Sequence, residues 1–341
     1  MKDRVIPEIG SFRYEFEESV ADAKIEFEYE ELDKEKVDKI LESDIKRIFK
    51  SEPKNIEELM RNRFVEFEGD IKRLEEDLTK RDKLRFMLLL YIGKSGNPIE
   101  TPFNNIDLSW LALLNRLNKF ASFAEQITGK ESRLVIAYEN EFFDANVLRK
   151  PFDNSKRALD TTAKLIKEFN MNHIELLNLK GLLDNLEGFN EEFSRLVDEY
   201  RNNLESFKNT EEFKESYKTL YYDYNTSSFS EAVKLYASRS KSIEDWAVES
   251  TIRYLAFIKG RANTGFWNKY KDYVRSTVSK KNNVITFNYH FGGVTLVHGV
   301  TIYRRSIRLE YFYDIVKERL EKGRELKFKV GKLYDVNMYI H

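Results

Sequence analysis

The chain of 341 residues contains no cysteine, which excludes disulfide bonds, thiolate metal sites and a cysteine nucleophile. The same absence fits a reducing compartment, and we expect a cytoplasmic protein. The four histidines are not spaced as zinc ligands are and there is no Asp-X-Asp loop, so no metal or other cofactor is predicted. The five prolines are scattered and mark no sharp domain boundary.

Long apolar runs and glycine-rich phosphate loops are missing as well. No stretch approaches the roughly 18 apolar residues of a membrane-spanning helix. The first ten residues hold no apolar run, so neither a membrane anchor nor a signal peptide is expected. Gly93-Lys94-Ser95 lacks the first glycine of a P-loop. No Gly-X-Gly-X-X-Gly follows a predicted strand, which excludes the common dinucleotide fingerprint.

Charges of the two signs nearly cancel. Lys and Arg number 57 and Asp and Glu number 58, so no net field attracts nucleic acid or an anionic membrane, and neither partner is expected. Charged residues make up 34% of the chain and aromatic residues 14%. This combination is typical of a well-filled core beneath a charged surface rather than of disorder.

Two short apolar runs indicate the fold class. Residues 134–138 and 173–179 have the continuous apolar character of strands buried on both faces. A helical pattern over residues 156–169 lies between them, and a strand-helix-strand unit of this length places its strands side by side and parallel. We therefore predict an α/β protein with a Rossmann-like mixed or parallel sheet and flanking helices.

The rest of the chain divides by its pattern into an N-terminal helical region, residues 1–83, and an α/β domain, residues 84–341, with a helical insertion at about 190–280 and a strand-rich C-terminal part. The run at 84–92 fits either a helix end or a buried strand. Further helices are predicted over residues 33–49, 56–79, 109–128 (ended by Gly129), 190–207, 211–221, 230–254, 266–279 and 309–320 (ended by Gly323). Further strands are predicted over residues 284–290, 294–303, 325–330 and 333–340.

Two of the four histidines, His290 and His298, end up in neighbouring strand-like segments. Gly292-Gly293 between these segments predicts a turn that pairs them antiparallel and brings both imidazoles to one region. Histidine is suited to proton transfer near neutral pH. The alternative is that both are structural histidines within a sheet.

Other polar residues stand where a ligand can be bound. Tyr138-Glu139-Asn140-Glu141 stands at the C-terminal end of a predicted parallel strand, where open α/β sheets bind ligands. Glu139 is either part of such a site or a solvated loop carboxylate. Arg304 and Arg305 are either a clamp for a phosphate or carboxylate or plain surface bases. His173 opens a strand, and we interpret it as structural.

Several of these segments resemble the isocyanide (isonitrile) synthase family, also called the pyoverdine/dityrosine biosynthesis family. Asn288-Tyr289-His290-Phe291 and Val297-His298-Gly299-Val300 stand where that family has Ser-Ile-His-Pro and a Trp-His-Gly/Asn-Val core. Residues 96–100, Gly-Asn-Pro-Ile-Glu, resemble its Gly-Lys-Pro-Ile-Glu, and residues 172–179 resemble its Asp-His-Ile strand. The matches are short and keep the family's order over about residues 85–340.

The chain departs from the family at polar positions. Tyr138-Glu139-Asn140 replaces Ser-Asp-Gly, and Thr286 replaces an arginine four residues before the first histidine. Residues 103–107 contain no base where the family carries a lysine. These departures support an alternative hypothesis, in which the chain is a catalytically altered relative that acts as a small-molecule-binding or scaffold protein.

The resemblance implies an enzyme that turns the α-amine of an amino acid, aromatic amino acids favoured, into an isonitrile. Ribulose 5-phosphate would be the carbon donor, in secondary-metabolite or spore-wall-type biosynthesis and without a metal. It implies His290 and His298 as the proton-transfer pair and Glu139 as a supporting base or amine anchor. Substrate and phosphate binding would fall to Arg304, Arg305, Tyr138 and Asn288. An iron/2-oxoglutarate oxygenase acting on the product is the implied partner.

Overall fold

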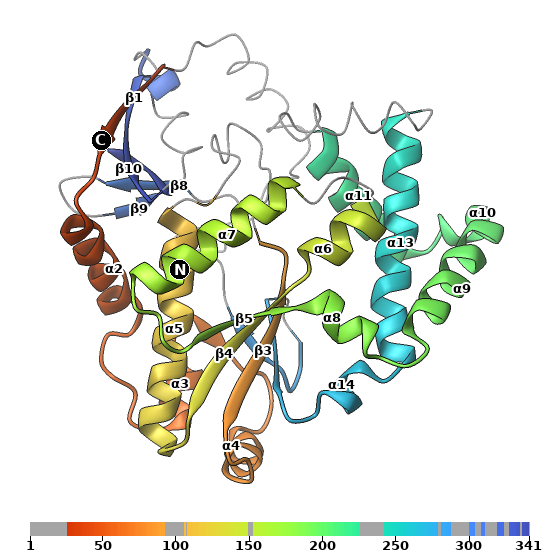
Figure 1. Ribbon diagram of the computed structural model, residues 1–341, viewed down its shortest axis with the longest axis horizontal. Helices are drawn as coiled ribbons and strands as arrows, with labels where there is room; N and C mark the ends of the chain where they lie inside the picture. Colours follow the sequence, from red (N-terminus) through yellow and green to blue (C-terminus); the bar gives the residue numbers. More distant parts are fainter. Residues whose placement is uncertain are drawn as a thin grey trace.

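A six-stranded, mostly parallel sheet forms the centre of the computed structural model (Figure 1). The structure describes residues 26–92, 106, 108–148, 153–225, 242–278, 281–287, 300–303, 308–310, 319–323, 327–334 and 336–340. In sheet order the strands are β2 (Val65–Glu66), β7 (Ile285–Phe287), β6 (Val274–Thr277), β3 (Leu84–Leu90), β4 (Ser132–Tyr138) and β5 (Ile174–Asn178). All neighbouring pairs are parallel except β2 and β7.

The predicted strand-helix-strand unit is confirmed. Strands β4 and β5 are parallel neighbours, with Leu134 opposite Ile174, and the helix between them is α7 (Asp153–Glu168). The run at 84–92 is the buried strand β3, whose residues Phe86, Met87 and Leu88 are fully buried. The fold class is therefore α/β, as predicted.

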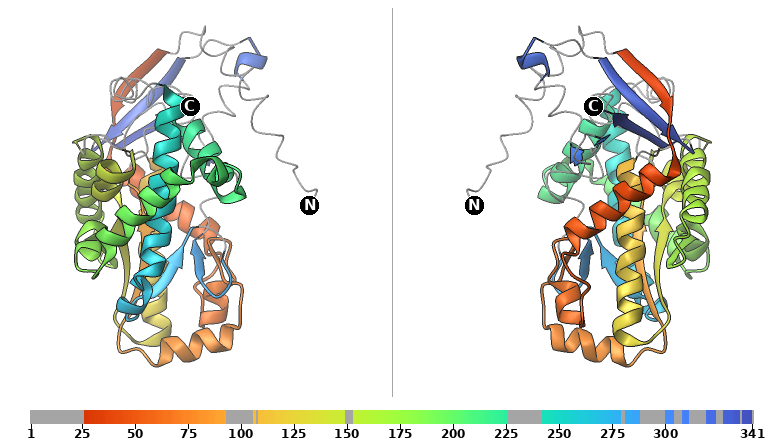
Figure 2. Two further views of the ribbon diagram at one scale, coloured as in Figure 1. Left: turned by 90° about the vertical axis from the view of Figure 1, so that its right-hand side faces the viewer. Right: turned by 90° about the vertical axis from the view of Figure 1, so that its left-hand side faces the viewer.

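Helices cover both faces of this sheet, and each face has its own core (Figures 1 and 2). Along β3, Phe86 and Leu88 enter the first core while Met87 enters the second, because side chains alternate along a strand. The first core is covered by α2 (Lys34–Ile48), α3 (Ile56–Met60), α4 (Ile71–Thr79), α5 (Leu108–Thr128) and α7. The second is covered by α6 (Asn140–Phe142), the π-helix η1 (Phe143–Leu148), α8 (Leu179–Asp184), α9 (Phe189–Asn202), α11 (Glu211–Asn225), α13 (Ile243–Asn263) and α14 (Phe266–Lys269).

A second, smaller sheet joins the two ends of the described chain. Its order is β1 (Glu26–Glu31), β10 (Lys327–Leu333), β11 (Val336–Ile340), β8 (Val300–Tyr303) and β9 (Arg308–Glu310). Strand β1 runs parallel to β10, and β8 and β11 contact α5. The N-terminal region predicted as helical therefore also supplies β1 to this sheet and β2 to the central one.

The predicted hairpin between residues 284–290 and 294–303 is wrong in its pairing. Strand β7 lies in the central sheet between β2 and β6, whereas β8 lies in the small sheet. Ile285 and Phe287 face the first core and Thr286 the opposite side, all three buried. An interior strand has hydrogen-bonded neighbours on both edges, so β7 offers no free edge to a hairpin partner.

Two predicted helices are broken. The helix expected over 56–79 is split into α3 and α4 because the Asn62 side chain caps the chain where it turns into β2. Its Oδ1 accepts from the Phe64 and Val65 amides at 2.8 and 2.9 Å. The helix expected over 190–207 is interrupted at Asn203, between α9 and α10 (Leu204–Phe207).

Two further helix predictions fail in part. The helix expected over 266–279 is only the single turn α14, after which β6 begins at Val274 and pairs with β3. Aromatic side chains at Phe266, Tyr270 and Tyr273 pack on one another and imitate a helical period. The helix expected over 309–320 overlaps β9 at its start, whereas Gly323, with φ +62°, follows a helical turn as predicted.

Candidate functional site

Only two of the predicted site residues, Tyr138 and Glu139, belong to the described part of the chain. His290, His298, Asn288, Arg304 and Arg305 lie outside it, so their roles stay predictions. Strand alternation puts Tyr138 and Glu139 on opposite sides of the sheet. Tyr138 packs on the first core, where the nearby Glu141 charge and burial raise its pKa, burial being the larger cause.

Glu139 is held at the carboxyl end of β4 by its neighbours. Its amide donates to the Leu90 carbonyl at 3.0 Å. The buried Asn140 side chain accepts from the Ile92 amide at 2.9 Å and donates to the Ile92 carbonyl at 2.5 Å. These bonds fasten the ends of β3 and β4 together. The backbone that carries the Glu139 side chain is thus held in place, and the side chain lies on the side of the second core.

The π-helix η1 follows Glu139, and its aromatic side chain Phe143 packs with neighbouring rings; we call this group of rings the π-helix wall. In η1, Phe143 packs between Tyr91 and Tyr254, with ring centroids 5.9 and 5.8 Å away. The buried Asp144 accepts from the Tyr91 hydroxyl at 2.7 Å. Helix α13 is tied to η1, since Arg253 donates to the Asn146 carbonyl at 3.1 Å. Short π-helical turns are frequent at functional sites because their wider turn re-aims side chains.

Helix α13 presents a polar stripe to this region although that face of the helix is buried. Ser250, Tyr254, Phe257 and Arg261 recur at helical spacing. The Ser250 hydroxyl is buried without a hydrogen-bond partner among the described residues. The same holds for Nε and Nη1 of Arg261, whose guanidinium lies 4.1 Å from the Phe257 ring centre. Buried donors are normally paired, so an unpaired set points to a ligand site.

The charges of Glu139 and Arg261 influence each other. Burial raises the pKa of the Glu139 carboxyl above its usual range, and the Arg261 charge opposes that rise. Burial also raises the pKa of Tyr254, with the Glu139 charge adding to the rise and Arg261 opposing it. A carboxyl with a raised pKa at a strand end is suited to general acid or base catalysis.

Two more cations approach from the β6 side. Arg275 is in register with Met87 of β3, so it lies on the face of the second core, and its guanidinium is 4.9 Å from the Trp267 ring centre. Lys281 follows β6 in the chain. Burial lowers the pKa of Lys281, and the charges of Arg275 and Arg261 lower it further. The charge of Arg275 thus acts on Arg261, and the charges of both arginines act on Lys281; we call these three residues the basic triad.

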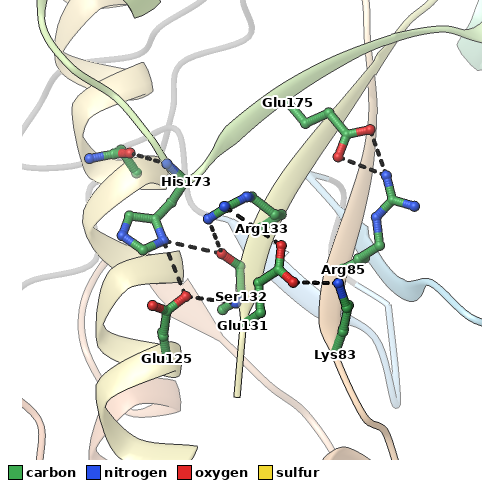
Figure 3. Close-up of polar contacts among 9 residues, drawn as sticks. Lys83, Arg85, Glu125, Glu131, Ser132, Arg133, His173 and Glu175 are labelled. Carbon is green, nitrogen blue, oxygen red and sulfur yellow. Dashed lines mark hydrogen bonds and ion pairs between the residues drawn. The ribbon is translucent and has the colours of Figure 1, made fainter. Parts of the chain in front are cut away.

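His173 lies at the opposite end of the sheet, within a polar network at the amino ends of β4 and β5 (Figure 3). Its amide donates to Asn118 at 3.0 Å, and its Nδ1 is 3.1 Å from the Ser132 carbonyl and 3.7 Å from Glu125. Lys83 pairs with Glu131 at 2.5 Å across β3 and β4 nearby. These contacts hold neighbouring strands and α5 together, as a structural histidine would.

A groove of about 560 Å³ lies between α2 and α5, on the first-core side of the sheet and away from Glu139. Acidic and basic side chains on its rim pair with each other along α2, as Lys39 with Glu35 at 2.6 Å and Lys46 with Glu42 at 3.4 Å. Two ion pairs thus neutralise part of the rim of the groove. The unpaired buried donors of Ser250 and Arg261 lie on α13, which covers the second core instead.

The sequence interpretation missed Tyr254, Arg261 and the other two members of the basic triad. A basic residue in the buried stripe of a helix was the available signal for Arg261. Arg275 was hidden because residues 266–279 were interpreted as one helix. Across the described ranges no three His, Asp or Glu side chains gather as metal ligands would. None of the described helices has the length and hydropathy needed to span a bilayer.

The fold and the site together define an α/β protein with a buried carboxyl and a basic triad at one end of a parallel sheet. No model of a known protein family matches the chain, and no curated protein matches it. Among solved structures, it is similar to the crystal structure of the PvcA protein from Pseudomonas aeruginosa. The TM-score is 0.55 and the identity 15%, covering 89% of this chain and 99% of that one. The two proteins thus share a fold over nearly their whole lengths.

Proposed function

We propose that the chain is an enzyme of the isocyanide synthase type, which joins the α-amine of an amino acid to ribulose 5-phosphate and leaves one sugar carbon on nitrogen as an isonitrile. One observation carries the proposal: Glu139, a mostly buried carboxyl with a raised pKa, stands at the carboxyl end of β4. The fold likeness to PvcA and the resemblance of the segments around His290 and His298 support it.

This chemistry requires repeated proton transfers in a site that excludes water. The amine condenses with the sugar ketone with loss of water, and proton removals then expel phosphate and fragment the sugar. Glu139 would accept or deliver one of these protons, beside the His290 and His298 pair predicted from the sequence. Arg304 and Arg305 would clamp the phosphate, and Asn288 would contact substrate. The contact predicted for Tyr138 does not fit this site, because Tyr138 packs on the first core, on the other side of the sheet from Glu139. The aromatic wall of Phe143 and Tyr254 favours an aromatic amino acid.

The wider setting is proposed on the same basis. The enzyme would work without a metal, in the cytoplasm, in secondary metabolism or spore-wall-type biosynthesis. An iron/2-oxoglutarate oxygenase would act on its product.

Mass spectrometry of the product tests the proposal. Purified protein is given ribulose 5-phosphate and each amino acid in turn, and we expect an isonitrile from at least one, with aromatic amino acids foremost. Glu139→Gln keeps the size of the side chain and removes its proton transfer, so turnover should fall by roughly a hundredfold or more. Glu187→Gln, a change at an exposed glutamate between α8 and α9, is the matched control. Absence of any isonitrile from every pairing would remove the proposal.

A second candidate is a catalytically altered relative that binds a small molecule without converting it. Thr286 favours it, because this residue stands where the resembling family has an arginine. Thr286 is buried, and its hydroxyl donates to the Val284 carbonyl at 3.3 Å. Binding of ribulose 5-phosphate without any product in the same assay would select this candidate.

A further inference from the structure

Three cations gather on the side of the second core. Arg261 lies 6.0 Å from the Phe266 ring centre, Arg275 lies 4.9 Å from the ring centre of the adjacent Trp267, and the charges of both arginines act on Lys281. The described part of the chain gives none of the three a carboxylate ion pair. The Arg275 charge opposes protonation of Arg261, and both oppose protonation of Lys281. Two acidic groups, Glu139 and Tyr254, act on Arg261, and burial raises the pKa of each, so both are less often ionised. Gathering like charges costs free energy unless an anion compensates them.

Arg261 is the deepest member of the basic triad. It is mostly buried, and its Nε and Nη1 atoms are buried without a hydrogen-bond partner among the described residues. The Phe257 ring centre lies 4.1 Å from its guanidinium, and the Phe266 ring centre lies 6.0 Å away. A cation-π contact of this kind leaves the N–H donors of a guanidinium available to an oxyanion.

Arg275 and Lys281 are the members of the basic triad that a ligand can reach from solvent. Both side chains are exposed, and they come from β6 and from the segment between β6 and β7, whereas Arg261 comes from α13. The Trp267 ring beside Arg275 limits where that guanidinium can lie. The basic triad thus consists of one mostly buried arginine and two exposed cations. It suits a compact group with two negative charges and several oxygen acceptors, which a carboxylate does not provide.

We propose that Arg261, Arg275 and Lys281 bind the phosphate group of a small phosphate ester, next to Glu139. The rest of the ester extends toward Tyr254 and the π-helix wall. The binding site rests on the contacts of Arg261 and Arg275 and on the two charges that act on Lys281, whatever the reaction is. Its role in catalysis, as the clamp for a sugar phosphate whose carbon chain reaches Glu139, rests on the proposed function. The basic triad is thus the alternative to the phosphate clamp that the sequence predicts at Arg304 and Arg305.

Calorimetric titration of the full chain with inorganic phosphate and with ribose 5-phosphate tests the site at constant ionic strength. We expect both to bind and the ester to bind more tightly, because the ester also gains contacts beside the phosphate. Arg275→Gln and Lys281→Gln should each weaken ester binding about tenfold or more, the usual effect of removing one charge-assisted hydrogen bond. Lys271→Gln, at an exposed lysine outside the triad, should leave it unchanged.

Thermal melting of the same variants separates a ligand site from a structural one. Without ligand, Lys281→Gln should melt at the same temperature as the wild type or higher, since it relieves repulsion. With phosphate, it should lose most of the stabilisation that the wild type gains. A lower melting temperature without ligand, or wild-type affinity in both Gln variants, overturns the proposal. So does a wild-type protein that binds neither compound at millimolar concentration.

The binding result and the synthase result can fail separately. Triad-dependent binding of the ester without isonitrile formation retains the phosphate site and removes the proposed enzyme. Isonitrile formation that is unaffected by Arg275→Gln and Lys281→Gln retains the enzyme and removes the triad as its phosphate site.

Discussion

At the scale of single residues, two buried arginines differ in their partners: one joins two helices through an ion pair, and the other has donors available to a ligand. Arg116 on α5 is fully buried and bonds Asp44 on α2 through Nε at 2.7 Å and Nη2 at 2.9 Å. Arg261 is the opposite case, since its buried donors have no such partner in the described chain. Arg116 therefore has a carboxylate partner within the described chain, and Arg261 has none there.

The Arg116–Asp44 pair yields a stability prediction. Asp44→Asn removes the charge that compensates a buried guanidinium, so the free energy of unfolding should fall by about 3–5 kcal/mol, measured by urea denaturation. Arg47, which also bonds Asp44 but is partly exposed, gives the control: Arg47→Gln should cost no more than about 1 kcal/mol. Equal losses in the two variants would contradict this role for the buried pair.

Glu139 predicts a pH dependence of stability with a definite sign. Its folded pKa is raised above 4.5, so between 4.5 and the folded pKa the native state binds more protons than the unfolded state. Stability therefore falls as the pH rises through that window. Glu139→Gln should remove this loss and become increasingly more stable than the wild type as the pH rises above 4.5. Urea denaturation across that range checks it, with Glu187→Gln expected to show no pH-dependent difference.

At the scale of elements, helix ends and glycines follow local rules. Gly129 lies just beyond α5 with φ +68°, and a Cβ there would meet nothing within 4 Å. Gly129→Ala should therefore cost about 1 kcal/mol through backbone strain alone. Gly181 within α8 also has open space but an ordinary backbone, so Gly181→Ala should stabilise by up to about 1 kcal/mol. Opposite signs of the two changes in thermal melting are the expected result.

The sequence predicted elements well where local chemistry decides them. The end of α5 at Gly129 and the buried runs of β4 and β5 could be found because their signals lie within a few residues. β6 could not be, since Val274–Thr277 is a strand only because β3 and β7 lie beside it. Glu139 was found from its place after a strand. Arg261 required knowing which face of α13 meets the sheet, which the neighbouring elements determine.

At the scale of the whole molecule, the small sheet depends on close approach of distant backbone. Leu32 donates its amide to Lys332 at 2.9 Å, and a Cβ at Gly331 would overlap the Leu32 side chain. Gly331→Ala should therefore lower the free energy of unfolding by about 1–3 kcal/mol through overpacking. Hydrogen exchange should show faster exchange of the Leu32 amide, with little change in the Leu134 amide of β4 at the centre of the molecule. Equal acceleration at both amides would contradict a local effect.

The pairing of β1 with β10 sets an order of events during synthesis. Glu26 of β1 pairs with Lys327 of β10, about 300 residues later in the chain. During synthesis β1 therefore has no neighbouring strand until the ribosome has made almost the entire described chain. A strand without its neighbour exposes unpaired backbone groups, which can pair with strands of other chains. The strand reads Glu-Phe-Glu-Tyr-Glu-Glu, and four carboxylates in six residues keep it hydrated and self-repelling in the meantime. When β10 arrives, Lys327 meets Glu26 and Lys332 covers Tyr29, so the acidic charge that protected the nascent strand then selects its partner.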